Sequence, residues 1–97
     1  MVNYVIDKDR ASYYEPLDIL YLTYGDGSLS CCDAVEDTPS GVTVMYGEDG
    51  ELDAAEIYDL FERISSLPAT ILIDAAVPFT LTINGAIGVP ERFMSLV

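Results

Sequence analysis

Six of the seven acidic side chains between residues 48 and 62 form the densest group in the sequence that could carry chemistry. They are Glu48, Asp49, Glu51, Glu56, Asp59 and Glu62. Carboxylates gathered in this way can steer a basic protein, hold a hard cation or, where burial separates their pKa values, act as acid and base. Because they surround a turn and continue along a predicted helix, we assign all six to partner binding.

The spacing of the last three carboxylates also suggests nucleic-acid mimicry. Helical neighbours three or four residues apart have Cβ atoms about 5–6 Å apart. This separation is not far from the spacing of phosphates along one nucleic-acid strand. Glu56, Asp59 and Glu62 would have it on a helix, so mimicry of nucleic acid is a hypothesis for how the chain meets a partner.

Other kinds of chemistry lack the side chains they need. An enzyme requires a nucleophile, a base and a group that stabilises developing charge, but the sequence has no histidine and the acidic segment has no cation. Asp7-Lys8-Asp9 begins like a calcium loop, but Ser12 stands where the sharp turn needs glycine. Residues 48–51 could hold a cation loosely, although an acidic turn explains them better. We therefore predict no enzyme activity, no catalytic residue, no metal and no cofactor.

The negative charge is concentrated in one block of the chain. The 97 residues include 17 acidic and 4 basic side chains, which give a formal net charge of −13. From Tyr13 to Glu62 there are 13 acidic residues and no basic one, whereas the flanking segments are neutral. The block has two interpretations, a solvated surface that provides solubility or a surface for a basic partner. Four basic side chains are too few for direct binding to nucleic acid.

Targeting and cysteine content indicate a cytoplasmic protein. The start of the sequence lacks the basic residues and apolar run of a secretory signal, and no apolar run approaches the roughly 20 residues of a membrane helix. Cys31 and Cys32 are adjacent, and a disulfide between neighbours would close a strained ring. We interpret them as small hydrophobic residues in a reducing compartment.

Most elements that would position the carboxylates are predicted strands. Alternating and β-branched residues indicate strands over 2–6, 17–24, 28–35, 42–46, 70–73, 79–83 and 86–89. Gly25-Asp26-Gly27 and Asn84-Gly85 are turn signals that would join hairpins. Residues 7–16 are predicted to be a polar connection, and Pro90 can open a last helical turn.

One segment has the pattern of a helix. Asp53 and Glu56 fit a capping box, and an apolar stripe of Ile57, Leu60, Phe61 and Ile64 follows at helical spacing. Pro68 would end this helix. The predicted fold is therefore α+β, with a mainly antiparallel sheet of hairpins packed against one main helix over about residues 53–67, in a single acidic domain of residues 1–97.

The seven tyrosines divide into two groups. Tyr21, Tyr24 and Tyr46 fall in predicted strands and are expected to serve as core or cross-strand residues. Tyr13, Tyr14 and Tyr58 stand near carboxylates outside those strands. An exposed tyrosine beside a charge is typical of a protein-binding surface, while half-buried tyrosine is the other interpretation.

Residues Tyr14 to Ile57 carry a pattern that resembles a known family. The elements are Tyr14-Glu15-Pro16, Asp18, Leu20-Tyr21-Leu22, Gly25-Asp26-Gly27, Gly41-Val42-Thr43-Val44-Met45-Tyr46, Glu48-Asp49-Gly50 and Glu56-Ile57. This resembles a widespread family of very short bacterial proteins catalogued as a domain of unknown function. The family usually continues from Asp-Gly into a strand, whereas the residues here favour a helix. The resemblance implies no catalytic residue and an antitoxin-like role beside small basic proteins.

Two functions follow from these observations. The first is a non-catalytic, acidic protein-binding module that neutralises or inhibits a basic, nucleic-acid-handling partner, as an antitoxin, an immunity protein or a phage inhibitor would. The second is a self-associating structural module whose acidity only provides solubility. Sheet edges and the apolar residues from Val77 to Val97 could then form a homodimer.

Overall fold

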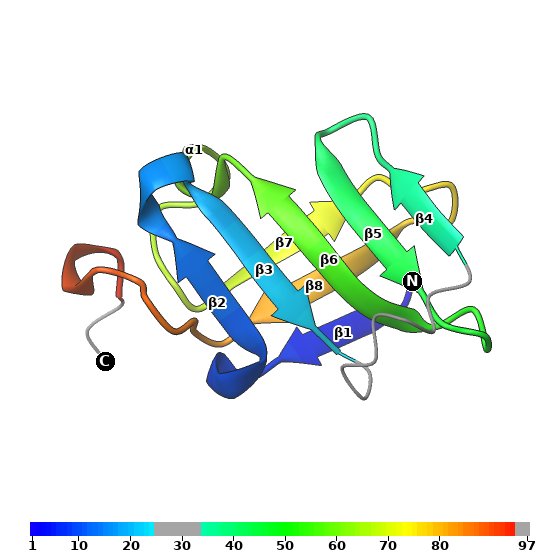
Figure 1. The fold of residues 1–97 in the computed structure, drawn as a ribbon, viewed down its shortest axis with the longest axis horizontal. Helices are drawn as coiled ribbons and strands as arrows, with labels where there is room; N and C mark the ends of the chain where they lie inside the picture. Colours follow the sequence, from blue (N-terminus) through cyan, green and yellow to red (C-terminus); the bar gives the residue numbers. More distant parts are fainter. Residues whose placement is uncertain (25–33, 95–97) are drawn as a thin grey trace.

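The chain folds into two β-sheets that face each other. The structure is a computed structural model that describes residues 1–24 and 34–94. In this part of the chain, a five-stranded sheet has the order β2-β3-β6-β5-β4 and a three-stranded sheet has the order β1-β8-β7. The larger sheet lies in front in Figure 1, and the strands of the smaller sheet cross behind it at an angle.

The larger sheet is antiparallel throughout. In sheet order its strands are β2 (Ala11–Tyr14), β3 (Ile19–Thr23), β6 (Leu52–Tyr58), β5 (Val42–Tyr46) and β4 (Ala34–Asp37). Successive side chains of a strand point to opposite faces. Leu20, Ile57 and Val42 thus form one row in the core, and Tyr21 beside Glu56 belongs to a row on the outer face.

The smaller sheet brings the two ends of the chain together. Its strands are β1 (Asn3–Ile6), β8 (Phe79–Ile83) and β7 (Ala69–Ile73), with β1 parallel and β7 antiparallel to β8. The whole larger sheet lies between β1 and β8 in the chain. The outer face of this smaller sheet carries Thr80 and Thr82, which both hydrogen-bond to the side chain of Asn3, and the exposed apolar side chains of Val5 and Leu72.

Both sheets contribute to one hydrophobic core between them. The largest fully buried side chains are Ile6, Leu20, Leu52, Ile57, Leu60, Leu67, Ile73, Leu81, Ile83, Val42 and Val44. Full burial of one such side chain contributes about 1.5–3 kcal/mol. The core therefore supplies the stability that must overcome the self-repulsion of the acidic block.

The predicted main helix over residues 53–67 is wrong, and so is the α+β class. Residues 52–58 form β6, the central strand of the larger sheet, and α1 (Leu60–Arg63) is a single turn. Ala55 and Ile57 are buried while Glu56 and Tyr58 point outward, which is the two-residue period of a strand. Pairing with β3 and β5 on both edges outweighs differences in helix propensity of at most about 0.7 kcal/mol per residue. The fold is mostly β.

Two predicted hairpins are also wrong. β4 pairs with β5 at the far edge of the sheet and not with β3, and the turn predicted at 25–27 lies outside the described residues. Asn84-Gly85 does not turn the chain back along β8. The N–H of Asn84 donates to the carbonyl of Ile6 at 2.9 Å, and Ile87 pairs with Ser12 of β2.

β2 falls in the segment predicted to be a polar connection, between two 3-10 turns at Lys8–Arg10 and Glu15–Leu17. Its outer edge is covered by the C-terminal segment. The N–H of Tyr13 donates to the carbonyl of Ile87 at 2.8 Å, and the N–H of Ile87 donates to Ala11 at 2.9 Å. Gly88 follows with φ +92°, so close that a Cβ there would lie 2.6 Å from the Tyr13 carbonyl oxygen. The chain then reaches a last 3-10 turn, Glu91–Phe93.

Candidate functional site

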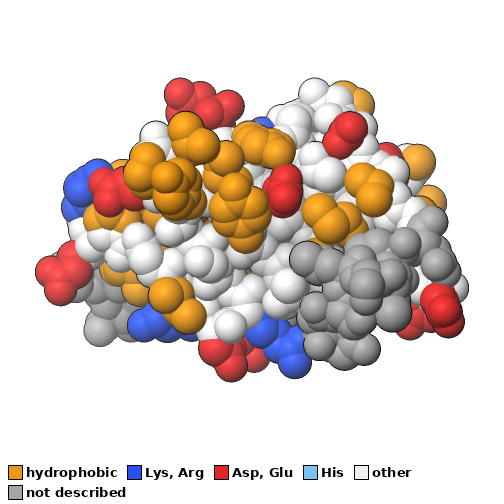
Figure 2. Space-filling model, viewed as in Figure 1, with side chains coloured by type: hydrophobic (Ala, Val, Ile, Leu, Met, Phe, Trp, Pro, Cys, Tyr) orange, Lys and Arg blue, Asp and Glu red, His pale blue; other side chains and the backbone are white. Residues whose placement is uncertain are grey.

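Three exposed tyrosines lie together on the outer face of the larger sheet. Tyr14, Tyr21 and Tyr58 come from β2, β3 and β6 and are 49%, 42% and 38% exposed. Ile19 stands between Tyr14 and Tyr58 in the strand register and is buried, although it lies outside the main core. Figure 2 shows hydrophobic side chains gathered over these strands. We call the surface of Tyr14, Ile19, Tyr21 and Tyr58 the tyrosine face.

Glu56 is the predicted site residue that lies on the tyrosine face. It is opposite Tyr21 on β3 and Thr43 on β5, and its Oε2 accepts a hydrogen bond from the Tyr58 hydroxyl at 2.8 Å. This bond and the negative charge of Glu56 raise the pKa of Tyr58, because both favour the neutral phenol. The carboxylate thereby orients Tyr58 and places a charge beside the aromatic rings.

The other five predicted carboxylates are exposed but separate into two groups. Glu48, Asp49 and Glu51 surround the turn between β5 and β6, whereas Asp59 and Glu62 lie beyond the other end of β6. β6 has seven residues, and a strand rises about 3.3 Å per residue, so the groups are roughly 20 Å or more apart. The structure does not gather the six carboxylates into one cluster, and the helical spacing expected for three of them does not exist.

The carboxylates at the β5–β6 turn shape their own segment. Asp49 Oδ1 accepts a hydrogen bond from the N–H of Glu51 at 3.0 Å, and Glu51 Oε2 accepts one from the Tyr4 hydroxyl at 2.9 Å. Burial raises the pKa of Tyr4, and the hydrogen bond to Glu51 adds to this effect. Asp49 and Glu51 therefore tie the turn to itself and to β1, and Glu48 is left on the outside.

Asp18 holds the tyrosine face against α1. It has the left-handed backbone conformation, with φ 53°, and its Oδ1 accepts hydrogen bonds from the Tyr13 hydroxyl at 2.7 Å and the Phe61 N–H at 3.2 Å. The Asp18 carbonyl accepts a third from the N–H of Leu60 at 3.1 Å. Burial, with the bond to Asp18 second, raises the pKa of Tyr13 to about 12. These contacts fix the ends of β2 and β3, from which Tyr14 and Ile19 project.

The acidic block of the sequence corresponds to one layer of the fold. Residues 13–62 include β3, β4, β5, β6 and half of β2, whereas β1, β7 and β8 come from the neutral flanks. Arg63, at the edge of the block, donates through Nε to the carbonyl of Tyr58 at 2.7 Å and through Nη2 to the carbonyl of Ser40. Both acceptors are neutral. In the described residues, the carboxylates of the block lie in the strands of this sheet and in the turns that join or follow them.

Neither a cluster of metal-ligating side chains nor a membrane-spanning helix occurs in the described residues. In residues 1–24 and 34–94, no group of three or more His, Cys, Asp or Glu side chains could hold a metal ion. In the same part of the chain, no helix is long and apolar enough to cross a membrane. Cys31 and Cys32 lie outside the described residues.

Sequence reasoning missed part of the tyrosine face. Tyr21 was expected in the core or in cross-strand pairs. It is a cross-strand residue, opposite Ser12 and Glu56, but it is exposed and not in the core. Tyr13 was expected in a loop beside Glu15 and is buried in β2. The signal for Tyr21 was available, since Leu20 and Leu22 alternate with it and identify the core side of β3. No comparable signal marks Tyr13, because its burial depends on Asp18 and Phe61.

The fold and this face define a small two-sheet β protein with an exposed aromatic surface on its acidic layer. No family model matches the chain, and the comparisons with curated proteins and solved structures give no significant match.

Proposed function

We propose that the protein is a non-catalytic binding module whose tyrosine face and surrounding carboxylates capture a basic, nucleic-acid-handling protein and neutralise or inhibit it. The observation that carries this proposal is the set of three exposed tyrosines on the layer that holds the net negative charge. The role would be that of an antitoxin, an immunity protein or a phage inhibitor, in the cytoplasm.

Tyrosine supports binding because it buries a large, rigid surface and keeps a polar hydroxyl at its tip. Interfaces are enriched in Tyr and Arg, and a few such residues carry most of the binding energy. The three tyrosines come from neighbouring strands and are aligned by register, so their backbone positions are fixed before a partner arrives. Binding then orders few additional groups.

The carboxylates support the choice of a basic partner. A field of one sign can raise the association rate 10- to 10³-fold, and this effect weakens with salt. Asp59 and Glu62 lie beyond the β6 end next to Tyr58, whereas Glu48, Asp49 and Glu51 lie at the far end. We therefore expect the first pair to affect affinity more. Nucleic-acid mimicry stays a hypothesis that no longer has the support of helical spacing.

Capture from a lysate of the native host at low and high salt tests the proposal. The immobilised protein should retain a basic protein at low salt and release most of it at high salt. The identified protein is then purified and its Kd measured. Tyr21→Ala should weaken binding at least roughly 30-fold, as expected for a central aromatic anchor.

Leu72→Ala is the matched control. Leu72 is 59% exposed and lies on the smaller sheet, so its truncation should leave Kd unchanged. An equal loss with both substitutions, or no basic protein retained at either salt concentration, would contradict the proposal. Sedimentation of the isolated protein completes the test, because a dimer that Tyr21→Ala dissociates would assign this face to self-association instead.

A further inference from the structure

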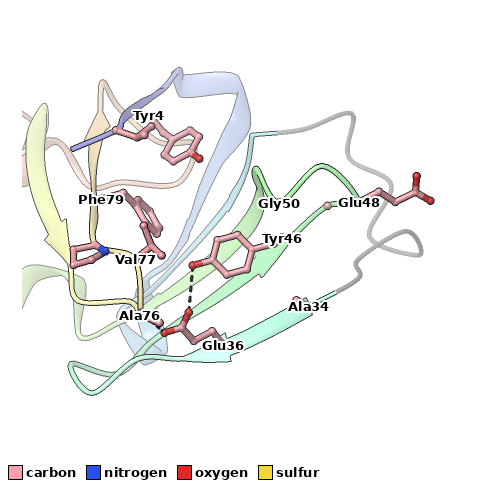
Figure 3. A pocket seen from close by; sticks show the side chains of 12 residues that line it. Tyr4, Ala34, Glu36, Tyr46, Glu48, Gly50, Ala76, Val77 and Phe79 are labelled. Atoms are coloured by element: carbon pink, nitrogen blue, oxygen red, sulfur yellow. Dashed lines mark hydrogen bonds between the residues drawn. The ribbon is translucent and has the colours of Figure 1, made fainter.

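A concave site separate from the tyrosine face lies between the two sheets (Figure 3), at the end of the molecule opposite α1 (Figure 1). Its volume is ≈ 400 Å³, and its walls come from β1, β4, β5 and the segment that leads into β8. Tyr4, Tyr46 and Phe79 supply aromatic surface, and Val77 and Pro78 supply aliphatic surface. The pocket is therefore mostly apolar, which is usual for a ligand site.

The aromatic walls are held in fixed positions. The rings of Tyr4 and Phe79 meet edge to face, with centroids 5.3 Å apart, and both residues are less than one-tenth exposed. Tyr4 is tied to Glu51 at the β5–β6 turn. Val77 at the rim is 79% exposed. The inner walls are thus rigid, and the rim is open to solvent.

Glu36 supplies the negative charge of the pocket. Its Oε1 accepts a hydrogen bond from the Tyr46 hydroxyl at 3.3 Å, and its Oε2 accepts one from the N–H of Ala76 at 2.7 Å. Both donors are neutral, so they fix the carboxylate without cancelling its charge. Glu48 also borders the pocket, but its side chain points away in Figure 3.

A carboxylate among aromatic and aliphatic walls matches a cation on an apolar stem. The ring faces of Tyr and Phe attract ammonium and guanidinium groups, and the methylene stems of Lys and Arg pack against apolar surface. A neutral apolar ligand would leave the carboxylate without a cationic partner. An anion would be repelled by Glu36 and by the net charge of the chain.

We propose that this pocket takes a lysine or arginine side chain of the basic partner, with the charged group at Glu36 and the stem between Tyr46, Phe79 and Val77. This inference rests on the proposed function for the source of the side chain, and on the pocket alone for its chemistry. It adds a second contact, on the opposite side of the larger sheet from the tyrosine face.

Amide and methyl NMR titrations of the full chain test the pocket chemistry without any partner. The probes are n-butylammonium, which reproduces the lysine side chain, and 1-butanol, its neutral analogue. The ammonium probe should shift the signals of Ala76, Val77 and Phe79 and bind at least roughly tenfold more tightly than the alcohol, as expected for a charge-assisted contact. Equal binding of both probes, or no binding, would overturn the inference even if the tyrosine face captures a partner.

Glu36→Gln should abolish the tenfold preference for the ammonium probe. Glu56→Gln is the matched control, because Glu56 also accepts a hydrogen bond from a tyrosine but lies on the outer face. It should keep the preference. Val77→Trp changes only an exposed rim residue and should block both probes, which keeps the test decisive if Glu36→Gln impairs folding. Ammonium binding that Val77→Trp leaves intact would overturn the assignment to this pocket.

A blocked pentapeptide, Gly-Gly-Lys-Gly-Gly, tests whether the cation can be presented on a protein backbone. It should bind at least as well as n-butylammonium, and its Nζ-acetylated form should lose the preference. A pocket that accepts the free amine but not the peptide would assign the site to a small amine and overturn the link to a partner.

Discussion

Tyr13→Phe removes the hydroxyl that joins β2 to the Asp18 carboxylate, a part-buried contact of 2.7 Å in which Tyr13 itself is buried. A hydrogen bond to a charged group contributes about 1.5–3 kcal/mol. Asp18 keeps its bond from the N–H of Phe61, so we expect a loss of about 2 kcal/mol in the free energy of unfolding. For a chain of this length, that loss lowers the melting temperature by roughly 8–16 °C.

The same contact predicts a specific dependence on pH. The pKa of Tyr13 is raised to about 12 in the folded protein from its ordinary value of 10.0. Below pH 10 the phenol is neutral in both states, and the stabilisation is complete. Between pH 10 and 12 the unfolded chain loses its proton first, so the folded state loses stability. At pH 11 the loss is about 1.4 kcal/mol.

The assay is urea unfolding at pH 8 and pH 11 for the native protein and for Tyr13→Phe. The difference in the free energy of unfolding between the two proteins should shrink by about 1.4 kcal/mol at pH 11. The variant has no phenol at this position, and the other tyrosines are present in both proteins, so their effects cancel. Tyr14→Phe is the control, since Tyr14 is the exposed neighbour on the same strand. A difference that does not change with pH, or an equal effect of Tyr14→Phe, would refute the reasoning.

Two further predictions concern the backbone and the net charge. Gly88→Ala should lower the free energy of unfolding in urea by about 2–5 kcal/mol, because it combines a positive φ with a Cβ 2.6 Å from the Tyr13 carbonyl oxygen. Gly50→Ala is the control, at φ +77° with no atom within 4 Å, and should lower it by only about 1–2 kcal/mol. Equal losses would show that the contact at Gly88 is not close. Raising NaCl from about 20 mM to about 300 mM should raise the melting temperature by at least about 4 °C, because salt screens the self-repulsion of a chain with net charge −13. An unchanged or lower melting temperature, measured by circular dichroism, would contradict this prediction.

Strands with strong local alternation could be predicted from the sequence. Val42–Tyr46 and Phe79–Ile83 have the predicted bounds, and Ala69–Ile73 differs by one residue. Each places β-branched or apolar residues at every second position, on its core side, so the two-residue period and the strand propensity of these residues agree. Their partners could not be predicted. β8 lies between β7, which precedes it in the chain, and β1, at the other end of the chain, and no local turn encodes the contact with β1.

β6 shows why the main helix was predicted and why it does not form. Its two alanines and two acidic residues favour a helix locally, and Ile57 and Leu60 have helical spacing and are both fully buried. Both side chains reach the core without a long helix, because Ile57 is an inward-pointing residue of β6 and Leu60 begins the single turn of α1. The left-handed Asp59 between them, at φ 56°, changes the direction of the chain.

The charge pattern is the feature that sequence and structure share most directly. A contiguous acidic block became one layer because β2 to β6 follow one another in the chain and occupy a single sheet, while the neutral flanks meet behind it as β1, β7 and β8. Had the strands of the two sheets alternated along the chain, the same composition would have spread its charge over both layers. The topology instead separates the layer that carries the tyrosine face and most of the described carboxylates from a layer whose outer face carries threonines. Under the proposed function, this layer is the side of the molecule that should attract a basic partner, and added salt should slow that association.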